Sequence, residues 1–166
     1  MPDFIGNLRL DQNWGYVGIS GAVHRVAGTY YGAAPIPANG HPDDKYGWAA
    51  GVGGLVYLPW DTTFGANFVG TQGALGYVTK AGNWQMNNGN SKGVGWVVDG
   101  IYDNVVPNVP GTTPTQIHLT SAWSANAGVE HMWNPRLRTS LYGGYTKVWY
   151  DSFTTNVINQ HLPTPA

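Results

Sequence analysis

Apolar and polar residues alternate with a period of two over long stretches of this chain. The pattern covers residues 4–11, 15–26, 46–58, 62–72, 117–133 and 136–146. In residues 15–26, for example, Val17, Ile19 and Val23 occupy odd positions, while Ser20 and His24 occupy even positions. A period of two predicts β-strands, and the many glycine and β-branched residues in these stretches argue against helices.

The connections between these predicted strands alternate in length. Residues 11–15, 58–63 and 133–137 form tight turns that contain Asn, Asp or Pro, whereas residues 28–44 and 74–91 and the tail 151–166 are long and polar. The strands are long, and a strand that crosses a bilayer at a tilt needs about 9 to 11 residues. Short turns at one end and long loops at the other are typical of outer-membrane barrels.

These observations predict one all-β domain spanning residues 1–166, an antiparallel transmembrane β-barrel of about eight strands. One segment, residues 92–104, fits two interpretations. It is either a strand of the barrel, with a short return strand near residues 116–120, or part of an inward-folded loop. Eight strands close only a narrow barrel, whose interior is largely filled by side chains.

A soluble β-sandwich that acts as a binding module is the alternative, because alternation alone does not say which face meets water. Charged residues make up 10% of this chain, against about 25% of an average soluble domain. The polar positions of the strands are mostly small and uncharged, whereas a soluble exterior usually carries more Lys and Glu. This difference favours the barrel.

Aromatic residues gather near both ends of the predicted strands. Tyr and Trp favour the interface between bilayer and water because one end of each side chain is apolar and the other is polar. We therefore predict two membrane-interface girdles, made of Trp14, Tyr46, Trp48, Trp60, Trp133, Tyr145 and Trp149.

Net charge and composition narrow the function further. The net charge of −1 gives no electrostatic case for nucleic acid, and the absence of cysteine excludes disulfides and thiolate metal sites. The first ten residues do not have the pattern of a secretory signal peptide. The uncharged stretch 46–60 is short of the roughly 20 apolar residues of a membrane helix.

No catalytic pattern stands out, so we expect neither an enzyme nor a cofactor. The Ser20 segment lacks the spacing of a nucleophile elbow, and the glycines at 51–54 lack the spacing of a dinucleotide fingerprint. The five histidines are scattered. The segment HPDD at 41–44 has the residue types of a cation-binding loop, although such a run is more often an ordinary solvated turn.

Three segments carry a resemblance to a known family: DDKYGWAAGVGGLVYLPW, ALGYVTKAGNWQM and SAWSANAGVEHMWNPRLRTSLYGGY. They resemble the porins of the alphaproteobacterial outer membrane, of the rhizobial and Brucella type. The resemblance implies a sixteen-stranded barrel, trimeric in its full-length form, that passes small hydrophilic solutes and ions passively across the bacterial outer membrane. Because such porins are much longer, it also implies that this chain is a porin segment or a nonfunctional truncated porin.

On a barrel, the period of two places several polar residues on the side that faces the lumen. These predicted pore-lining residues are Arg9, Asp11, His24, Asn67, Asn126, Glu130, Arg136 and Arg138. Opposed charges inside a water-filled passage bias which solutes pass. The alternative is that these charges only pair with one another and fill a narrow barrel.

Overall fold

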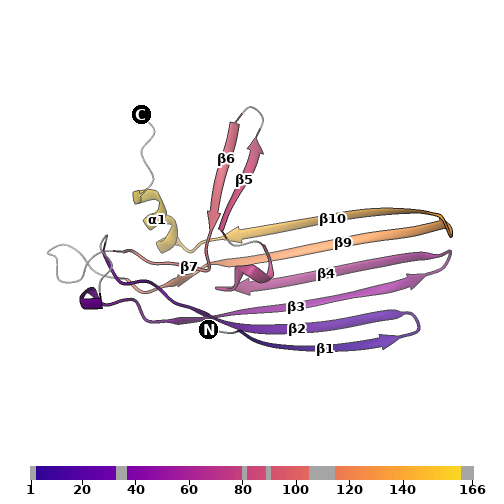
Figure 1. The fold of residues 1–166 in the computed structure, drawn as a ribbon, viewed down its shortest axis with the longest axis horizontal. Helices are drawn as coiled ribbons and strands as arrows, with labels where there is room; N and C mark the ends of the chain where they lie inside the picture. Colours follow the sequence, from indigo (N-terminus) through magenta and orange to yellow (C-terminus); the bar gives the residue numbers. More distant parts are fainter. Residues whose placement is uncertain (1–2, 33–36, 80–81, 89–90, 105–114, 162–166) are drawn as a thin grey trace.

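The computed structural model describes residues 3–32, 37–79, 82–88, 91–104 and 115–161. Its main element is a six-stranded antiparallel sheet in the order β1-β2-β3-β4-β9-β10 (Figure 1). The strands are β1 (Phe4–Gln12), β2 (Gly15–Val26), β3 (Lys45–Leu58), β4 (Thr62–Gln72), β9 (Ser121–Asn134) and β10 (Leu137–Trp149). The prediction of a mostly antiparallel β-structure is therefore confirmed.

The tight turns lie together at one end of this sheet, as the sequence predicted (Figure 1). The turn between β1 and β2 ends at Gly15, whose φ of 142° is a backbone conformation that favours glycine. The turn between β3 and β4 places Trp60 and Asp61 at φ values of 60° and 51°. Its backbone also contacts the neighbouring strand, because the N–H of Met132 donates to the carbonyl of Asp61 at 3.0 Å.

The sheet is open, so the prediction of a small closed barrel is wrong for the described residues. β1 and β10 are its two edge strands, and they do not pair with each other. The count of about eight strands is also wrong for the main sheet, which has six. Among the described residues, no helix is long and apolar enough to cross a bilayer.

The remaining strands of the described residues lie between β4 and β9. We call this segment, residues 73–120, the insertion. It contains the short helix η2 (Leu75–Tyr77), a hairpin of β5 (Gly82–Asn88) and β6 (Ser91–Val97), and a two-residue pairing of β7 (Gly100–Ile101) with β8 (His118–Leu119). The strand residues within 92–104 therefore pair inside the insertion and not with the six-stranded sheet. Residues 74–91, expected to be a polar loop, contain η2 and β5.

The buried core of the described residues is small and lies where the insertion packs on the sheet. One cluster joins Ala22, Ala49 and Ala74, and the other joins Leu75, Val97 and Ala122. These side chains come from the long-loop half of the strands and from the insertion.

The tail beyond residue 150 contains a helix, α1 (Ser152–His161), which the sequence pattern did not predict. Asp151 caps its first turn, because a carboxylate oxygen of Asp151 accepts the backbone N–H of Thr154 at 2.7 Å. Burial raises the pKa of the Asp151 carboxyl, but hydrogen bonds from Thr154 and His118 outweigh burial and lower it. The ring of Phe153 stacks on His118 at 4.1 Å, which ties α1 to the insertion.

Candidate functional site

Side chains alternate across each strand, so the pairing registers divide the six-stranded sheet into two faces. The outer face carries Leu8, Leu10, Val17, Ile19, Val23, Trp48, Val52, Phe64, Phe68, Trp123, Val129, Leu141 and Tyr145. The inner face carries Asn7, Arg9, Tyr16, Ser20, Gly53, Asn67, Thr71, Ser124, Asn126, Glu130, Ser140 and Tyr142. Both faces follow the division into odd and even positions that the sequence suggested.

The outer face is apolar and exposed. Val17, Trp48, Phe68 and Leu141 keep 37%, 48%, 47% and 71% of their surface accessible. They come from β2, β3, β4 and β10 and share one side of the sheet instead of converging on a common centre. A soluble sandwich buries such a face against a second layer, and no second layer covers this one within the described residues.

The aromatic residues of the predicted girdles lie at the two ends of the sheet. Trp14 and Trp60 lie in tight turns, and Trp133 lies at the adjacent end of β9. Tyr46, Trp48, Tyr145 and Trp149 lie on the outer face toward the long-loop end of β3 and β10.

Near that long-loop end, three rings form a row across β4, β9 and β10. Trp123 stacks on Phe68, with ring centroids 5.8 Å apart, and meets Tyr145 at 5.4 Å. The outer face therefore carries continuous aromatic surface across three strands.

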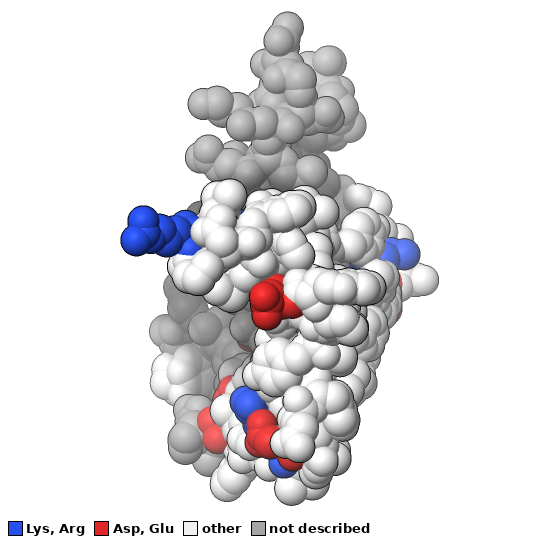
Figure 2. Space-filling model, turned by 90° about the vertical axis from the view of Figure 1, so that its right-hand side faces the viewer, with Lys and Arg blue, Asp and Glu red and all other residues white. Residues whose placement is uncertain are grey.

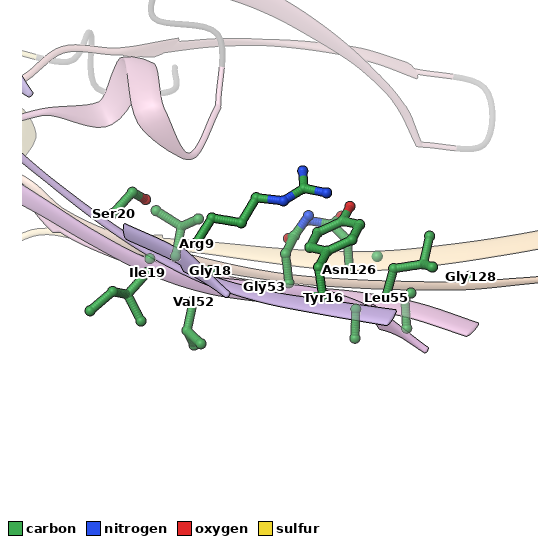
Figure 3. A pocket seen from close by; sticks show the side chains of 18 of the residues that line it. Arg9, Tyr16, Gly18, Ile19, Ser20, Val52, Gly53, Leu55, Asn126 and Gly128 are labelled. Carbon is green, nitrogen blue, oxygen red and sulfur yellow. The ribbon is translucent and has the colours of Figure 1, made fainter. Parts of the chain in front are cut away.

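The inner face contains a hollow of about 950 Å³ at the turn-end half of the sheet. Its lining includes a run of glycines from five strands, namely Gly18, Gly51, Gly53, Gly65, Gly128 and Gly144. Figure 3 shows Arg9, Tyr16 and Leu55 rising into the hollow, while Val52 points away on the other side of the sheet. Where glycines meet across strands, the floor of the hollow is bare backbone.

Larger polar side chains lie flat over some of these glycines. A Cβ on Gly128 would come within 2.6 Å of the ring of Tyr142, and one on Gly144 would come within 2.1 Å of Oδ1 of Asn126. The amide of Asn126 also donates to the amide oxygen of Asn67 at 3.0 Å. The two predicted lumen asparagines therefore meet across β4 and β9 and form an uncharged polar strip.

The charged residues of the inner face mostly pair with their neighbours near the turn end. Arg9 bonds to Asp11 at 2.7 Å, and its guanidinium lies 3.8 Å from the centre of the Tyr16 ring. Arg138 lies 3.7 Å from Glu130. Figure 2, a view onto the turn end, shows charge as isolated groups on a surface that is largely uncharged.

The eight predicted pore-lining residues thus divide into two groups. Arg9, Asn67, Asn126 and Glu130 line the hollow. Asp11 and Arg138 lie beside it as charge partners, Arg136 lies in the turn between β9 and β10, and His24 lies at the other end of the sheet under the insertion.

His24 belongs to a part-buried polar cluster that fastens the insertion to the sheet. Its Nδ1 lies 2.7 Å from a carboxylate oxygen of Asp3, and its Nε2 lies 3.6 Å from Asp99. Tyr77 of η2 donates to the other oxygen of Asp3 at 2.7 Å. The hydrogen bond from His24, followed by that from Tyr77, lowers the pKa of Asp3, and the bond to Asp3 raises the pKa of Tyr77.

The sequence pattern did not predict several residues of the hollow and of the His24 cluster. Tyr16 and Tyr142 share the alternation of the inner-face positions, so period two was a sufficient signal for them. Asp3, Tyr77 and Asp99 carry no local signal, because the insertion brings them together only after it folds back on the sheet.

Two side chains of the HPDD segment at 41–44 make contacts within the chain. Asp44 pairs with Arg25 of β2, and a ring nitrogen of His41 lies 2.8 Å from the carbonyl oxygen of Pro42. Within the described residues, no three His, Asp or Glu side chains gather in a group able to hold a metal ion.

Comparisons of this chain with family models, with curated proteins and with solved structures give no significant match.

Proposed function

We propose that this chain forms part of the wall of a porin-type passive diffusion channel for small hydrophilic solutes in a bacterial outer membrane. The outer face would contact lipid, and the inner face would line an aqueous passage. The observation that carries the proposal is the contrast between the two faces of one sheet. One face is continuous exposed apolar surface, and the other is a glycine-floored hollow whose lining includes the Asn67–Asn126 amide pair and the charged Arg9 and Glu130.

The distribution of charge supports this orientation. A Lys or Arg that faces lipid at mid-depth costs about 2–4 kcal/mol, whereas near the interface the cost falls to about 0–1 kcal/mol. Arg9 and Glu130 project from the inner face. Lys147 is on the outer face but near the end of β10, where its long side chain can reach the interface.

Strand length and the aromatic residues agree with a bilayer span. β3 and β9 each have 14 residues and β2 has 12, against the 9 to 11 or so that a tilted strand needs. The aromatic residues lie near both ends of these strands, where Trp and Tyr are favoured in membranes.

The inner face also suggests the class of solute. Its central strip consists of glycine backbone, the Asn67–Asn126 amide pair and the Tyr142 ring, and its nearest charges are already paired. Such a wall favours small neutral hydrophilic solutes and imposes only weak ion selectivity.

The test uses one substitution on two neighbouring residues of β4 that face opposite ways. The whole chain is reconstituted into lipid vesicles and planar bilayers, with solute-driven vesicle swelling and conductance as readouts. Phe68→Arg puts a charge on the outer face and should prevent stable insertion. Asn67→Arg puts the same charge on the inner face, should still insert, and should shift selectivity toward anions.

Channel activity of the unsubstituted chain is the first requirement. An inserted, strand-rich protein that gives neither swelling nor conductance would reject the channel. Equal insertion of the two Arg variants would reject the assignment of the outer face to lipid.

A further inference from the structure

The six-stranded sheet ends in two long edge strands that are both open. β1 is exposed at every residue, and β10 is exposed at every residue except Val148. In the part of the chain that the structure describes, neither has a strand on its free side. Each edge therefore presents a row of backbone N–H and C=O groups able to pair with another strand.

A membrane setting makes these free edges costly. In hydrocarbon each unpaired backbone group costs several kcal/mol, which is why strands span membranes only as closed barrels. Six strands are fewer than the roughly eight of the smallest membrane barrels. If the proposed function holds, on which this inference rests, the sheet needs further strands at both edges.

Within the described residues, the chain segments next to the edges do not supply those strands. After β10 the chain turns into α1, which is tied to the insertion by the His118 contacts with Asp151 and Phe153. Before β1, Asp3 is bonded to His24 and Tyr77. The contacts of Asp3 with His24 and Tyr77, and those of Asp151 and Phe153 with His118, thus hold both segments at the long-loop end of the sheet.

The two edges are complementary in direction. Neighbouring strands alternate along the sheet, so β1 and β10 run in opposite directions. β1 of one copy beside β10 of a second copy therefore gives an antiparallel pair, with all tight turns at one end. A pairing of β1 with β1 would either place the turns at opposite ends or turn one outer face inward.

The side chains at the two edges are also compatible. Phe4, Leu8 and Leu10 of β1 would continue the outer face of Leu141 and Tyr145 on β10. On the inner face, Asp11 and Arg138 carry opposite charges, and each lies near the turn end of its strand. Each already has a partner within its own copy, Arg9 for Asp11 and Glu130 for Arg138, so a contact between them would extend these pairs across the junction.

We infer that β1 of one copy pairs with β10 of a second copy, and that two copies joined in this way at both edges close a twelve-stranded barrel. Six strands from each copy give an even, fully antiparallel ring, within the size range of membrane barrels. Head-to-tail contacts of this kind form a closed ring when the rotation between copies closes.

The test is disulfide cross-linking in vesicles, and the chain is suited to it because it contains no cysteine. Leu8→Cys protein is mixed with protein that carries a cysteine on the outer face of β10, at Thr139, Leu141 or Gly143 in turn, so that the pairing register is sampled. Val52→Cys is the matched control, because Val52 is equally apolar and 48% exposed but lies in the interior strand β3.

Covalent dimers should form in at least one mixture and not with either variant alone or with the Val52→Cys control. A Leu8→Cys, Leu141→Cys double variant, or its register-matched equivalent, should stop at the dimer. Dimers from one variant alone would overturn the pairing of unlike edges. Covalent trimers or longer ladders from the double variant would overturn closure by two copies.

Conductance of the same vesicles separates this inference from the proposed function. Channels without cross-links would mean that the copies cover their edges in an arrangement other than β1 beside β10, and would overturn the inference alone. Cross-linked dimers without channels would overturn the proposed function and leave the edge pairing in place.

Discussion

The two halves of the inner face have the same strand pattern but opposite surroundings. In the long-loop half, Ala49, Thr71, Ala122 and Ser124 are at most 5% exposed, and the insertion packs on Ala49 and Ala122. In the turn-end half, Gly53, Asn67 and Asn126 line an open hollow. Small residues on one face therefore allow close packing under the insertion in one half and leave an open surface in the other half.

The largest expected difference between the halves comes from truncating a leucine in each. Leu75 of the insertion is fully buried against Val97 and Ala122, so Leu75→Ala should destabilise the protein by about 2–5 kcal/mol. Leu55→Ala, in the hollow, should cost at most about 1 kcal/mol because its side chain is only partly buried. Urea unfolding in detergent micelles measures both. Equal losses would show that the hollow is packed as tightly as the insertion.

A glycine in each half gives a second, smaller contrast. A Cβ at Gly47 would meet the backbone of Gly73, where the insertion leaves the sheet, at 2.2 Å. Gly47→Ala should therefore cost about 1–3 kcal/mol. A Cβ at Gly65, in the hollow, meets nothing closer than 3.6 Å, so Gly65→Ala should be neutral or stabilising. Matching unfolding midpoints for the two variants would contradict the close approach at Gly47.

Acid should loosen the insertion before it affects the open half. The lowered pKa of Asp3 means that its bonds stabilise the fold above about pH 4, and that this contribution is lost as pH falls through the folded pKa. The raised pKa of Tyr77 has the opposite consequence. Its bond to Asp3 stabilises the fold below about pH 10, and this contribution is lost as pH rises through the folded pKa.

Spin-label distances between Gly76→Cys on the insertion and Ser20→Cys on the sheet measure this loosening. Asp3→Asn should remove the acid transition, and Tyr77→Phe should remove only the alkaline one. An acid transition that persists unchanged in Asp3→Asn would assign it to other groups.

The smallest effect is expected in the polar strip of the hollow. Asn126→Ala removes an exposed amide pair and should change stability by less than about 1 kcal/mol. If the chain forms the proposed channel, its conductance should stay the same or rise slightly, because the substitution also uncovers Gly144. Ser124→Ala, on the same strand but under the insertion, is the control and should leave conductance unchanged. A large loss of stability in Asn126→Ala would identify the strip as a structural element.

Alternation predicted most of the sheet. The stretches 15–26, 46–58 and 62–72 match β2, β3 and β4 within one residue, because side-chain direction in a strand is a local property. The same reasoning placed Asn67 and Asn126 on one face, where they meet.

The insertion was not predictable in this way. Residues 92–104 alternate as convincingly as the sheet strands, and only the partner of β6 distinguishes a hairpin from a barrel strand. Partner choice depends on contacts distant in sequence, as do the packing of Leu75 and the cluster of His24 with Asp3 and Asp99. The openness of the sheet likewise depends on what meets its edges, which no local pattern specifies.

If the proposed function holds, the peptide planes at Gly18, Gly53 and Gly65 are places where main chain, and not a side chain of the same residue, forms the wall of the passage. Gly18 and Gly65 are then graded adjustment points, where Ala, Ser and Val placed in turn would narrow the passage stepwise, whereas a Cβ at Gly53 would meet the Cβ of Asn67 at 3.0 Å. A molecule built this way lends itself to tuning as a molecular sieve with few changes to the strands that hold it in place.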